Sequence, residues 1–523
     1  MGRRSGLPGE CWSSSRDYCR LCSSSPGSCA GGTRRGRTDW PRRGEFPSGT
    51  SPRGSPTSLE LERRALDHPQ ELHVTPETIS RYADRALPRY TSYPTAPHFA
   101  PGMDPQLYGE WLAALPQGEP VSVYLHVPFC RSMCWYCGCH TTITARDAPI
   151  ARYLDALHAE IAWAGARIGR VLPARHIHFG GGTPSLMHPD QFLALMERLR
   201  ATVGIDAATE VAMELDPRTL EPEMIAALGK GGITRASLGV QSFDPVVQRA
   251  INRIQSYEQT AAATRGLRAA GVAGVNFDLI YGLPLQTIDS CADTVARALE
   301  LRPDRFAVFG YAHVPSFKIH QRKIDEATLP SGPERHAQAE AIAGLLEGAG
   351  YVRIGLDHYA LPEDELAQAA AAGKLHRNFQ GYTTDGCATL LGFGASSIGR
   401  LPQGYVQNAV LIGDYQKRVA GHGTASTKVC AFQGEDRLRA SIIERIMCDY
   451  RVDLADLCGR HGSDATRMLA GAAEIPALVA DGLVTLEGGL IEVPHDARPL
   501  VRAVAAAFDE YLGQTNARHS RAV

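Results

Sequence analysis

The chain lacks the long apolar runs and the charge imbalance that are typical of membrane proteins and nucleic-acid-binding proteins. No stretch reaches the roughly 18 uninterrupted apolar residues of a membrane-spanning helix. The 54 Lys and Arg nearly balance the 56 Asp and Glu, and the net charge of -2 indicates neither a nucleic-acid nor a membrane partner. The 13 cysteines form no small disulfide framework. The content of 44% hydrophobic and 21% charged residues is typical of a globular protein. The cysteine usage of such a large chain indicates the reducing cytoplasm.

Residues 1–73 have few aliphatic side chains and many Arg, Ser, Gly and Pro, so they cannot bury a core. Their four cysteines match no metal-binding spacing, and an Arg- and Ser-rich leader also resembles an organellar transit peptide. We expect a disordered or mis-called extension at 1–73. An N-terminal segment at 74–115 would follow it and cover the functional site.

Three cysteines follow an apolar strand with the spacing Cys-x3-Cys-x2-Cys. They are Cys130, Cys134 and Cys137, in the run Phe-Cys-Arg-Ser-Met-Cys-Trp-Tyr-Cys-Gly-Cys-His. Iron–sulfur clusters are held mainly by cysteine thiolates, normally four, so a set of three leaves one iron of a cubane open. An open iron can chelate S-adenosylmethionine and reduce its sulfonium to a 5′-deoxyadenosyl radical. This is the spacing of the radical S-adenosylmethionine enzymes; a zinc knuckle or scattered structural thiols are the alternatives.

From residue 121, strand and helix patterns alternate along the chain. The expected strands are Val121–Pro128, His176–Gly180, Glu210–Leu215, Arg235–Val240, Gly274–Ile280 and Arg305–Tyr311. Between the first two, five apolar residues recur at helical spacing: Ile150, Tyr153, Leu154, Leu157 and Ile161. Six such units predict an α/β fold over residues 116–416, with a parallel sheet curled into a partial (β/α)6 barrel. Active-site residues of such barrels gather at the C-terminal ends of the strands.

The pattern changes after residue 416. Helical patterns at Arg437–Cys448 and Ala465–Ala472 precede two short strands, Leu483–Glu487 and Leu490–Val493, separated by Gly488-Gly489. Two glycines between strands indicate a hairpin with a primed turn. A helix at Leu500–Leu512 follows. We therefore expect a mostly helical, winged-helix-like C-terminal domain at 417–523, which serves as a lid because no basic excess favours DNA binding.

Polar or glycine residues lie at the ends of three strands. In the run Gly180-Gly181-Gly182-Thr183, the three glycines remove every Cβ where a ligand could lie against the backbone; a plain glycine-rich turn is the alternative. Glu214 ends the third strand, where it could bind ribose hydroxyls or an ammonium group, or simply face water. Gln241 ends the fourth, and an amide in an apolar strand is costly unless it is hydrogen-bonded.

An acid lies inside the fifth strand. Asp278 occupies the middle of Val-Asn-Phe-Asp-Leu-Ile-Tyr, and parallel strands are buried on both faces, so its carboxyl needs a partner. Arg253 is one candidate partner, although sequence alone also allows an ordinary surface arginine.

Several segments of the chain resemble those of a known family, the oxygen-independent coproporphyrinogen III oxidases. The resemblance extends from about Ser80 to the C-terminus. The specific segments are Pro88–Ala96 (Pro-Arg-Tyr-Thr-Ser-Tyr-Pro-Thr-Ala), the cysteine run with its extra Cys139, Tyr311–Pro315 and His376–Thr384. The resemblance implies a radical S-adenosylmethionine enzyme with a 4Fe-4S cluster on Cys130, Cys134 and Cys137. It implies that Cys139 is catalytic without being an iron ligand.

The resemblance also implies two S-adenosylmethionines in one site. The residues expected at the cluster-bound molecule are Tyr124, Gly181, Glu214, Ala312 and Ile398. Those expected at the second are Tyr136, Gly182, Thr183, Gln241, Arg253 and Asp278. At the position of Tyr136 the family often has Phe.

The implied reaction turns the ring A and B propionates of coproporphyrinogen III into vinyl groups and gives protoporphyrinogen IX. Since the substrate has four carboxylates, arginines should face it, and Arg89 is a candidate. We expect a cytoplasmic monomer with an unidentified low-potential electron donor. The rivals are a haem chaperone of the same subfamily, which typically lacks the Cys-Gly-Cys and Asn-Phe-Gln-Gly-Tyr segments present here, and a zinc-stabilised interaction module.

Overall fold

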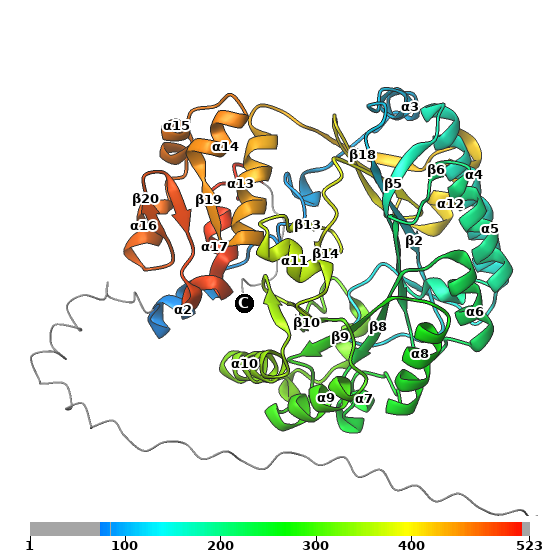
Figure 1. The fold of residues 1–523 in the computed structure, drawn as a ribbon, viewed down its shortest axis with the longest axis horizontal. Coiled ribbons are helices and arrows are strands. Elements are labelled where there is room, and N and C mark those ends of the chain that lie inside the picture. Colours follow the sequence, from blue (N-terminus) through cyan, green and yellow to red (C-terminus); the bar gives the residue numbers. More distant parts are fainter. Residues whose placement is uncertain (1–73, 84, 515–523) are drawn as a thin grey trace, which may run out of the picture. The chain divides into compact units, whose positions relative to one another are not determined.

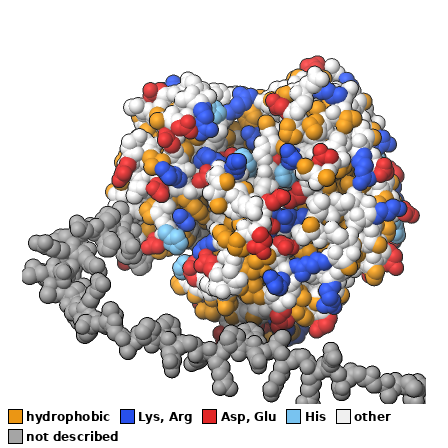
Figure 2. Space-filling model, viewed as in Figure 1, with side chains coloured by type: hydrophobic (Ala, Val, Ile, Leu, Met, Phe, Trp, Pro, Cys, Tyr) orange, Lys and Arg blue, Asp and Glu red, His pale blue; other side chains and the backbone are white. Residues whose placement is uncertain are grey.

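The computed structural model describes residues 74–83 and 85–514. The expectation for residues 1–73 lies outside the described residues. None of the described helices is long and apolar enough to cross a membrane. On the face that Figure 2 shows, acidic and basic side chains are interspersed rather than gathered into a field of one sign.

The six expected strands are confirmed, and they lie side by side in the order of the sequence (Figure 1). They are β2 (Val121–Val127), β5 (Leu172–Gly181), β7 (Glu210–Leu215), β8 (Arg235–Gln241), β9 (Gly274–Tyr281) and β10 (Arg305–Gly310). Each pairs with the next in parallel, as expected of strands joined by helical crossovers. Their apolar side chains form the main core. Among the described residues β10 does not pair with β2, so the barrel is open.

Helices cover the outer face of this sheet (Figure 1). They are α4 (Ala148–Ile168), α5 (Pro189–Arg200), α6 (Pro222–Gly231), α7 (Pro245–Ala250), α8 (Tyr257–Ala269), α9 (Ile288–Glu300) and α10 (Gly332–Gly348). The five apolar residues expected on one face of the first crossover helix are all buried in α4. Gly169 ends α4 in the left-handed region, with φ of 69°.

The sheet continues beyond the six strands on both sides. On one side β15 (Thr389–Phe393) pairs in parallel with β2, followed by antiparallel β16 (Ile398–Leu401), β17 (Gly404–Asn408), β18 (Ser426–Ala431) and β1 (Ala100–Pro101). On the other, β10 pairs with β12 (His358–Ala360), which pairs with β11 (Val352–Ile354). The short strands are β3 (Phe129–Cys130), β4 (Thr142–Ile143), β6 (Val203–Gly204), β13 (His376–Asn378) and β14 (Gly381–Thr383). The remaining helices here are α11 (Glu365–Ala371) and α12 (Ile412–His422).

The C-terminal module has its own core. It comprises α13 (Asp436–Asp449), β19 (Arg451–Asp453), α14 (Leu454–Arg460), α15 (Ala465–Gly471), α16 (Ile475–Ala480), β20 (Thr485–Glu487), β21 (Leu490–Glu492) and α17 (Val501–Ala506). Gly488 and Gly489, with φ of 59° and 92°, form the expected primed turn. The last helix is shorter than expected. Because β18 belongs to the barrel sheet, the sheet runs past residue 416, and we propose that the module begins at α13.

The N-terminal segment, which contains α2 (Pro76–Ala83) and α3 (Pro105–Ala113), packs partly into that module. The Tyr82 hydroxyl donates to Asp481 (2.7 Å) and the Tyr90 hydroxyl donates to Asp509 (3.1 Å). Farther along the segment, β1 pairs with β18 of the barrel sheet. The segment therefore joins the module to the barrel.

Buried Glu160 of α4 connects this helix to the antiparallel half of the sheet. Its carboxylate accepts hydrogen bonds from Gly394 N (2.8 Å), Asn408 Nδ2 (2.7 Å) and the Tyr415 hydroxyl (2.8 Å). A buried carboxylate is tolerated when donors satisfy its oxygens in this way.

We predict that Glu160→Gln destabilises the protein by about 1–3 kcal/mol, because the amide turns an NH2 group toward a hydrogen-bond donor. The thermal unfolding midpoint measures the effect. Glu197→Gln, at an exposed position of α5, is the control and should leave the midpoint almost unchanged. Equal midpoints for Glu160→Gln and wild type would contradict the structural role of this carboxylate.

Candidate active site

The cysteine loop leaves β2 through β3 and is held by the strands beneath it. Thr141 and Thr183 donate hydroxyl hydrogen bonds to Cys130 Sγ (3.2 and 3.5 Å). Two guanidinium groups reach the buried Cys134 Sγ, from Arg218 and from Arg253, each at 3.5 Å. Such cationic contacts favour thiolates, which are the form that binds metal.

Cys137, the third thiol of the set, lies in a different environment. The Cys139 thiol hydrogen-bonds to Cys137, and this contact chiefly lowers the pKa of Cys137 to about 6 and raises that of Cys139. The Cys139 backbone N–H also donates to Cys137 Sγ (3.4 Å). His320 Nε2 lies 2.7 Å from the Cys137 carbonyl, and Lys318 Nζ donates to the Cys139 carbonyl (3.1 Å). Cys139 is thus a partner of the thiol set and is exposed.

The donor set fits an iron–sulfur cluster. Cys130, Cys134 and Cys137 offer three soft sulfur ligands from one loop, and all three are free thiols. Within the described ranges, no group of three or more His, Cys, Asp or Glu side chains could hold a single metal ion.

The glycine run at the end of β5 allows protein groups to approach the backbone closely. A Cβ on Gly180 would lie 2.7 Å from Glu214 Oε1, and one on Gly181 would lie 2.8 Å from the His126 ring. A Cβ on Gly182 would lie 2.5 Å from the Phe129 carbonyl oxygen. The glycines make room for the side chains and backbone that build the site, and the expected approach of a ligand to this backbone stays a prediction.

Glu214 at the end of β7 is held as a carboxylate. Its oxygens lie 3.1 Å from His178 Nε2 and accept from Gly181 N–H at 3.2 Å. Burial opposes ionisation, but the His178 hydrogen bond and charge, followed by the Gly181 bond, keep the pKa of Glu214 below its ordinary value. The Tyr124 ring stacks on His178 at 6.0 Å. Tyr124, Gly181 and Glu214 therefore lie together, and their contact with the cofactor stays a prediction.

Two further predicted residues lie near these groups or the cysteine loop. Ile398 of β16 faces Gly392 of β15, and Gly392 pairs with Tyr124 across the sheet. Gln321 Nε2 donates to the carbonyls of Ala312 (3.2 Å) and Tyr136 (3.0 Å), which brings the chain after β10 against the cysteine loop.

Arg253 is buried, and its partner is Asp216 rather than Asp278. Its two terminal nitrogens lie 3.3 Å from the Asp216 oxygens, and Arg218 also binds this carboxylate. The expected Arg253–Asp278 pair is therefore wrong: Asp216, two residues after Glu214, already neutralises the guanidinium. The Gln241 amide and Arg253 both face Gly239, whose Cβ would lie 2.9 and 3.1 Å from them.

Gln241 and Asp278 are both held in unusual states. Gln241 has a φ of 68°, in the left-handed region that non-glycine residues seldom occupy, and such strain concentrates at functional sites. Asp278 accepts a hydrogen bond from the Ser237 hydroxyl (2.9 Å), and burial raises the pKa of Asp278 to about 6. Such a carboxyl can donate as well as accept near neutral pH.

Sequence reasoning missed several residues of this site. His126 lies 3.0 Å from the Tyr124 hydroxyl, and Asp216 holds Arg253. Both lie two positions after a predicted site residue, so the two-residue period of a strand could have revealed them. His178 is likewise two residues before Gly180. His320 lies in the short 3-10 helix Ile319–Lys323, Lys318 precedes it, and neither carried such a signal.

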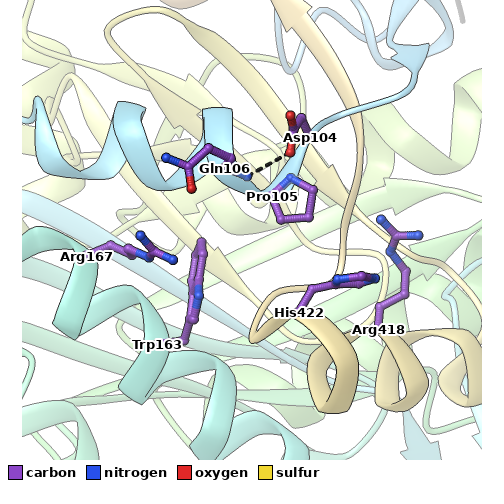
Figure 3. Close-up of a pocket in the computed structure, with 7 residues that line it drawn as sticks. All are labelled: Asp104, Pro105, Gln106, Trp163, Arg167, Arg418 and His422. Carbon is purple, nitrogen blue, oxygen red and sulfur yellow. Dashed lines mark hydrogen bonds between the residues drawn. The ribbon is translucent and has the colours of Figure 1, made fainter.

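A surface cavity of about 390 Å³ lies elsewhere (Figure 3). It is lined by Asp104, Pro105, Gln106, Trp163, Arg167, Arg418 and His422. The hydrogen bond in it, from Gln106 N–H to Asp104 (2.9 Å), is the N-cap of α3. Trp163 and Arg167 belong to the last turns of α4, which lie near the amino ends of the strands, opposite the thiols. This cavity is therefore not the candidate site.

The fold and the site together define the class of protein. Six parallel strands carry a Cys-x3-Cys-x2-Cys loop over their carboxyl ends, and the Radical SAM superfamily model matches residues 124–298. The protein is a radical S-adenosylmethionine oxidoreductase, with a 4Fe-4S cluster and S-adenosylmethionine as the cofactors of its class.

Relatives narrow the class to one family. An oxygen-independent coproporphyrinogen III oxidase of Bradyrhizobium diazoefficiens is 57% identical over 442 residues, 84% of this chain and 98% of the relative. That of Escherichia coli is 39% identical over 431 residues, 82% of this chain and 93% of the relative. The solved Escherichia coli structure matches with a TM-score of 0.79 at 37% identity, over 85% of this chain and 100% of that one. The chain belongs to the oxygen-independent coproporphyrinogen III oxidases.

We predict that Gly182→Ala lowers turnover and stability, because the added Cβ would push the strand end away from Phe129; overpacking of this kind costs about 1–3 kcal/mol. The matched control is Gly138→Ala in the cysteine loop, where a Cβ meets nothing within 4 Å. Turnover, the thermal unfolding midpoint and iron content are measured for both variants. Wild-type behaviour of Gly182→Ala would show that this close contact is dispensable.

Proposed function

We propose that the protein decarboxylates the ring A and ring B propionates of coproporphyrinogen III to vinyl groups, which releases two CO2 and gives protoporphyrinogen IX. The observation that carries the proposal is the three-thiol loop beside strand ends that hold an ionised Glu214 and a buried Asp278. The relatives are named as oxidases of this substrate, so the haem-chaperone alternative is not favoured.

When bound, the cluster and S-adenosylmethionine supply the one-electron reduction that yields a 5′-deoxyadenosyl radical able to remove hydrogen from a propionate β-carbon. Cys130, Cys134 and Cys137 would hold the cluster. Glu214, kept ionised by its neighbours, would accept hydrogen bonds from an ammonium group or ribose hydroxyls. Tyr124, Gly181, Ala312 and Ile398 would contribute the surrounding contacts.

We also propose a second S-adenosylmethionine in the same site. Two propionates react, and each needs one hydrogen abstraction. The polar groups at the strand ends exceed what one nucleotide requires, because Gln241 on β8 and Asp278 on β9, with Arg253, come in addition to Tyr124 and Glu214. With Tyr136, Gly182 and Thr183, they would bind the second molecule.

The other partners are also proposals. The protein would be a cytoplasmic monomer, in keeping with an oxygen-labile cluster and a reducing compartment. An unidentified low-potential donor would reduce the cluster. After each hydrogen abstraction the substrate radical would lose CO2 and one electron, which an unidentified electron acceptor would take up. The domain limits proposed are 74–115 for the N-terminal segment, then the barrel, then the module from α13.

Anaerobic reconstitution followed by product analysis tests the function. The iron-loaded protein, with S-adenosylmethionine and a chemical reductant, should convert coproporphyrinogen III into protoporphyrinogen IX. A parallel haem titration should show no stoichiometric binding. Haem binding without any vinyl product would instead support the chaperone.

We predict that Cys139→Ser keeps the cluster but loses turnover, because Cys139 contacts Cys137 without being one of the three ligands. Cys134→Ser, at a buried thiol bound by Arg253, should lose both. Iron content and visible absorbance give the comparison. If both variants lost iron to the same extent, the assigned set of ligands would be wrong.

We predict that Asp278→Ala lowers turnover at least tenfold while the cluster still binds S-adenosylmethionine, because Asp278 serves the second molecule. Equilibrium binding of labelled S-adenosylmethionine should fall from two molecules per chain to one. Asp289→Ala, at an exposed acid of α9, is the control. Wild-type stoichiometry in Asp278→Ala would refute the second site.

A further inference from the structure

An arginine pair lies where three distant parts of the chain meet. Arg89 belongs to the N-terminal segment and Arg377 to β13, and Arg377 Nε lies 3.4 Å from the Arg89 carbonyl. Arg502, at the start of α17, donates to the carbonyls of Leu87 and Pro88. The C-terminal module thus fixes the backbone that carries Arg89.

Arg377 has unused hydrogen-bonding capacity. Its guanidinium stacks on the Tyr382 ring, 4.4 Å from the ring centroid. Its Nη1 is buried and has no hydrogen-bond partner in the part of the chain that the structure describes. A buried donor without an acceptor is costly, so such a group indicates a missing ligand.

The side chain of Arg89 is exposed and, among the described residues, forms no ion pair with a carboxylate. The guanidinium groups of Arg89, Arg377 and Arg502 lie close enough to interact. Burial lowers the pKa of Arg502 most, and the charges of Arg89 and Arg377 lower it further, to about 10. Grouped cations of this kind are stabilised by a bound anion.

The acids near the pair have other partners. Asp357 lies 2.7 Å from its neighbour His358 Nδ1, and Glu444 lies 3.2 Å from His376 and accepts from the Arg377 backbone N–H. Asp357 nevertheless faces both arginines. Burial opposes its ionisation, but the His358 hydrogen bond and charge, followed by the charges of Arg377 and Arg89, keep the pKa of Asp357 below its ordinary value. An incoming anion would share the guanidinium groups with this one carboxylate.

The pair is connected to the barrel interior through His358. The charge of His358 acts on Asp278, and its ring packs edge-on against Tyr382 at 5.5 Å. Gly381 permits this packing, because a Cβ there would lie 3.0 Å from the His358 ring. Arg218 and Arg253 contact Cys134, whereas Arg89 and Arg377 contact neither the thiols nor the groups hydrogen-bonded to them.

We propose that Arg89 and Arg377 bind a carboxylate of the tetrapyrrole that the reaction leaves intact. The proposal rests on the proposed function. A propionate that reacts must reach the radical beside the thiols, so a carboxylate held by this separate pair belongs to a ring whose propionate survives. The pair therefore positions substrate, and the product keeps the same group.

The test measures porphyrin binding by the anaerobic, iron-loaded full chain. Coproporphyrin III has four carboxylates, protoporphyrin IX has two, and coproporphyrin tetramethyl ester has none. Fluorescence titrations compare wild type with Arg89→Met, Arg377→Met and Arg377→Lys. The control is Arg460→Met, at an exposed arginine of α14 that pairs with Asp456.

Each Met variant should bind both acids about tenfold to a hundredfold more weakly, since a charge-assisted hydrogen bond is lost. The ester should bind all variants alike, and Arg377→Lys should recover part of the affinity. In turnover, KM for coproporphyrinogen should rise while kcat stays within about twofold.

Unchanged affinity of Arg89→Met for both acids would overturn the proposal, as would an equal loss of ester binding. Arg89→Met changes an exposed side chain, so it tests the proposal even if Arg377→Met unfolds. The two ideas fail separately. Wild type without vinyl product would refute the proposed function, whereas active wild type and variants of equal KM would refute only the arginine pair.

Discussion

The close approach of the β5 backbone to β2 and β3 is the constraint on which the rest of the site depends. Side chains at 180, 181 and 182 would overlap with Glu214, His126 and the Phe129 carbonyl. Only glycine allows these groups to stand next to the strand end. Gly181 also has a φ of 115°, which aims its N–H at Glu214. The cysteine loop begins directly after Phe129, so the same contact also positions this loop.

Buried charges then give the site its chemistry. Glu214 is ionised because His178 and a backbone N–H face it. Asp278 has only a hydroxyl partner, and burial raises the pKa of its carboxyl to about 6. Arg253 is neutralised by Asp216 while it still reaches Cys134. Removing one partner of such a buried pair is more costly than the pair itself is stabilising. These groups therefore stay fixed in place before any ligand binds.

The barrel was predictable because its signals are local. Each parallel strand is a short apolar run, and the helical spacing in Ile150–Ile161 leaves one interpretation. The thiol set and Glu214 were predictable from spacing and from position at strand ends. The partners were not. Arg253 could have paired with either of two acids, and only the strand register decides that Asp216 is the nearer one. Strands β15 to β18 were missed because β15 pairs in parallel with β2, which lies far from it in the sequence, and the antiparallel strands that follow build on this pairing. The pairing of Arg89 with Arg377, nearly three hundred residues apart, likewise has no local signal.

The central claim is that three thiols hold a four-iron cluster whose open iron binds S-adenosylmethionine beside Glu214. Electron paramagnetic resonance of the reduced, reconstituted protein tests it most directly, with and without S-adenosylmethionine. The account predicts a cluster signal that changes when S-adenosylmethionine is added, and a Glu214→Gln variant whose cluster forms but responds weakly. A protein that takes up no iron, or a cluster signal that S-adenosylmethionine leaves unchanged, would contradict it.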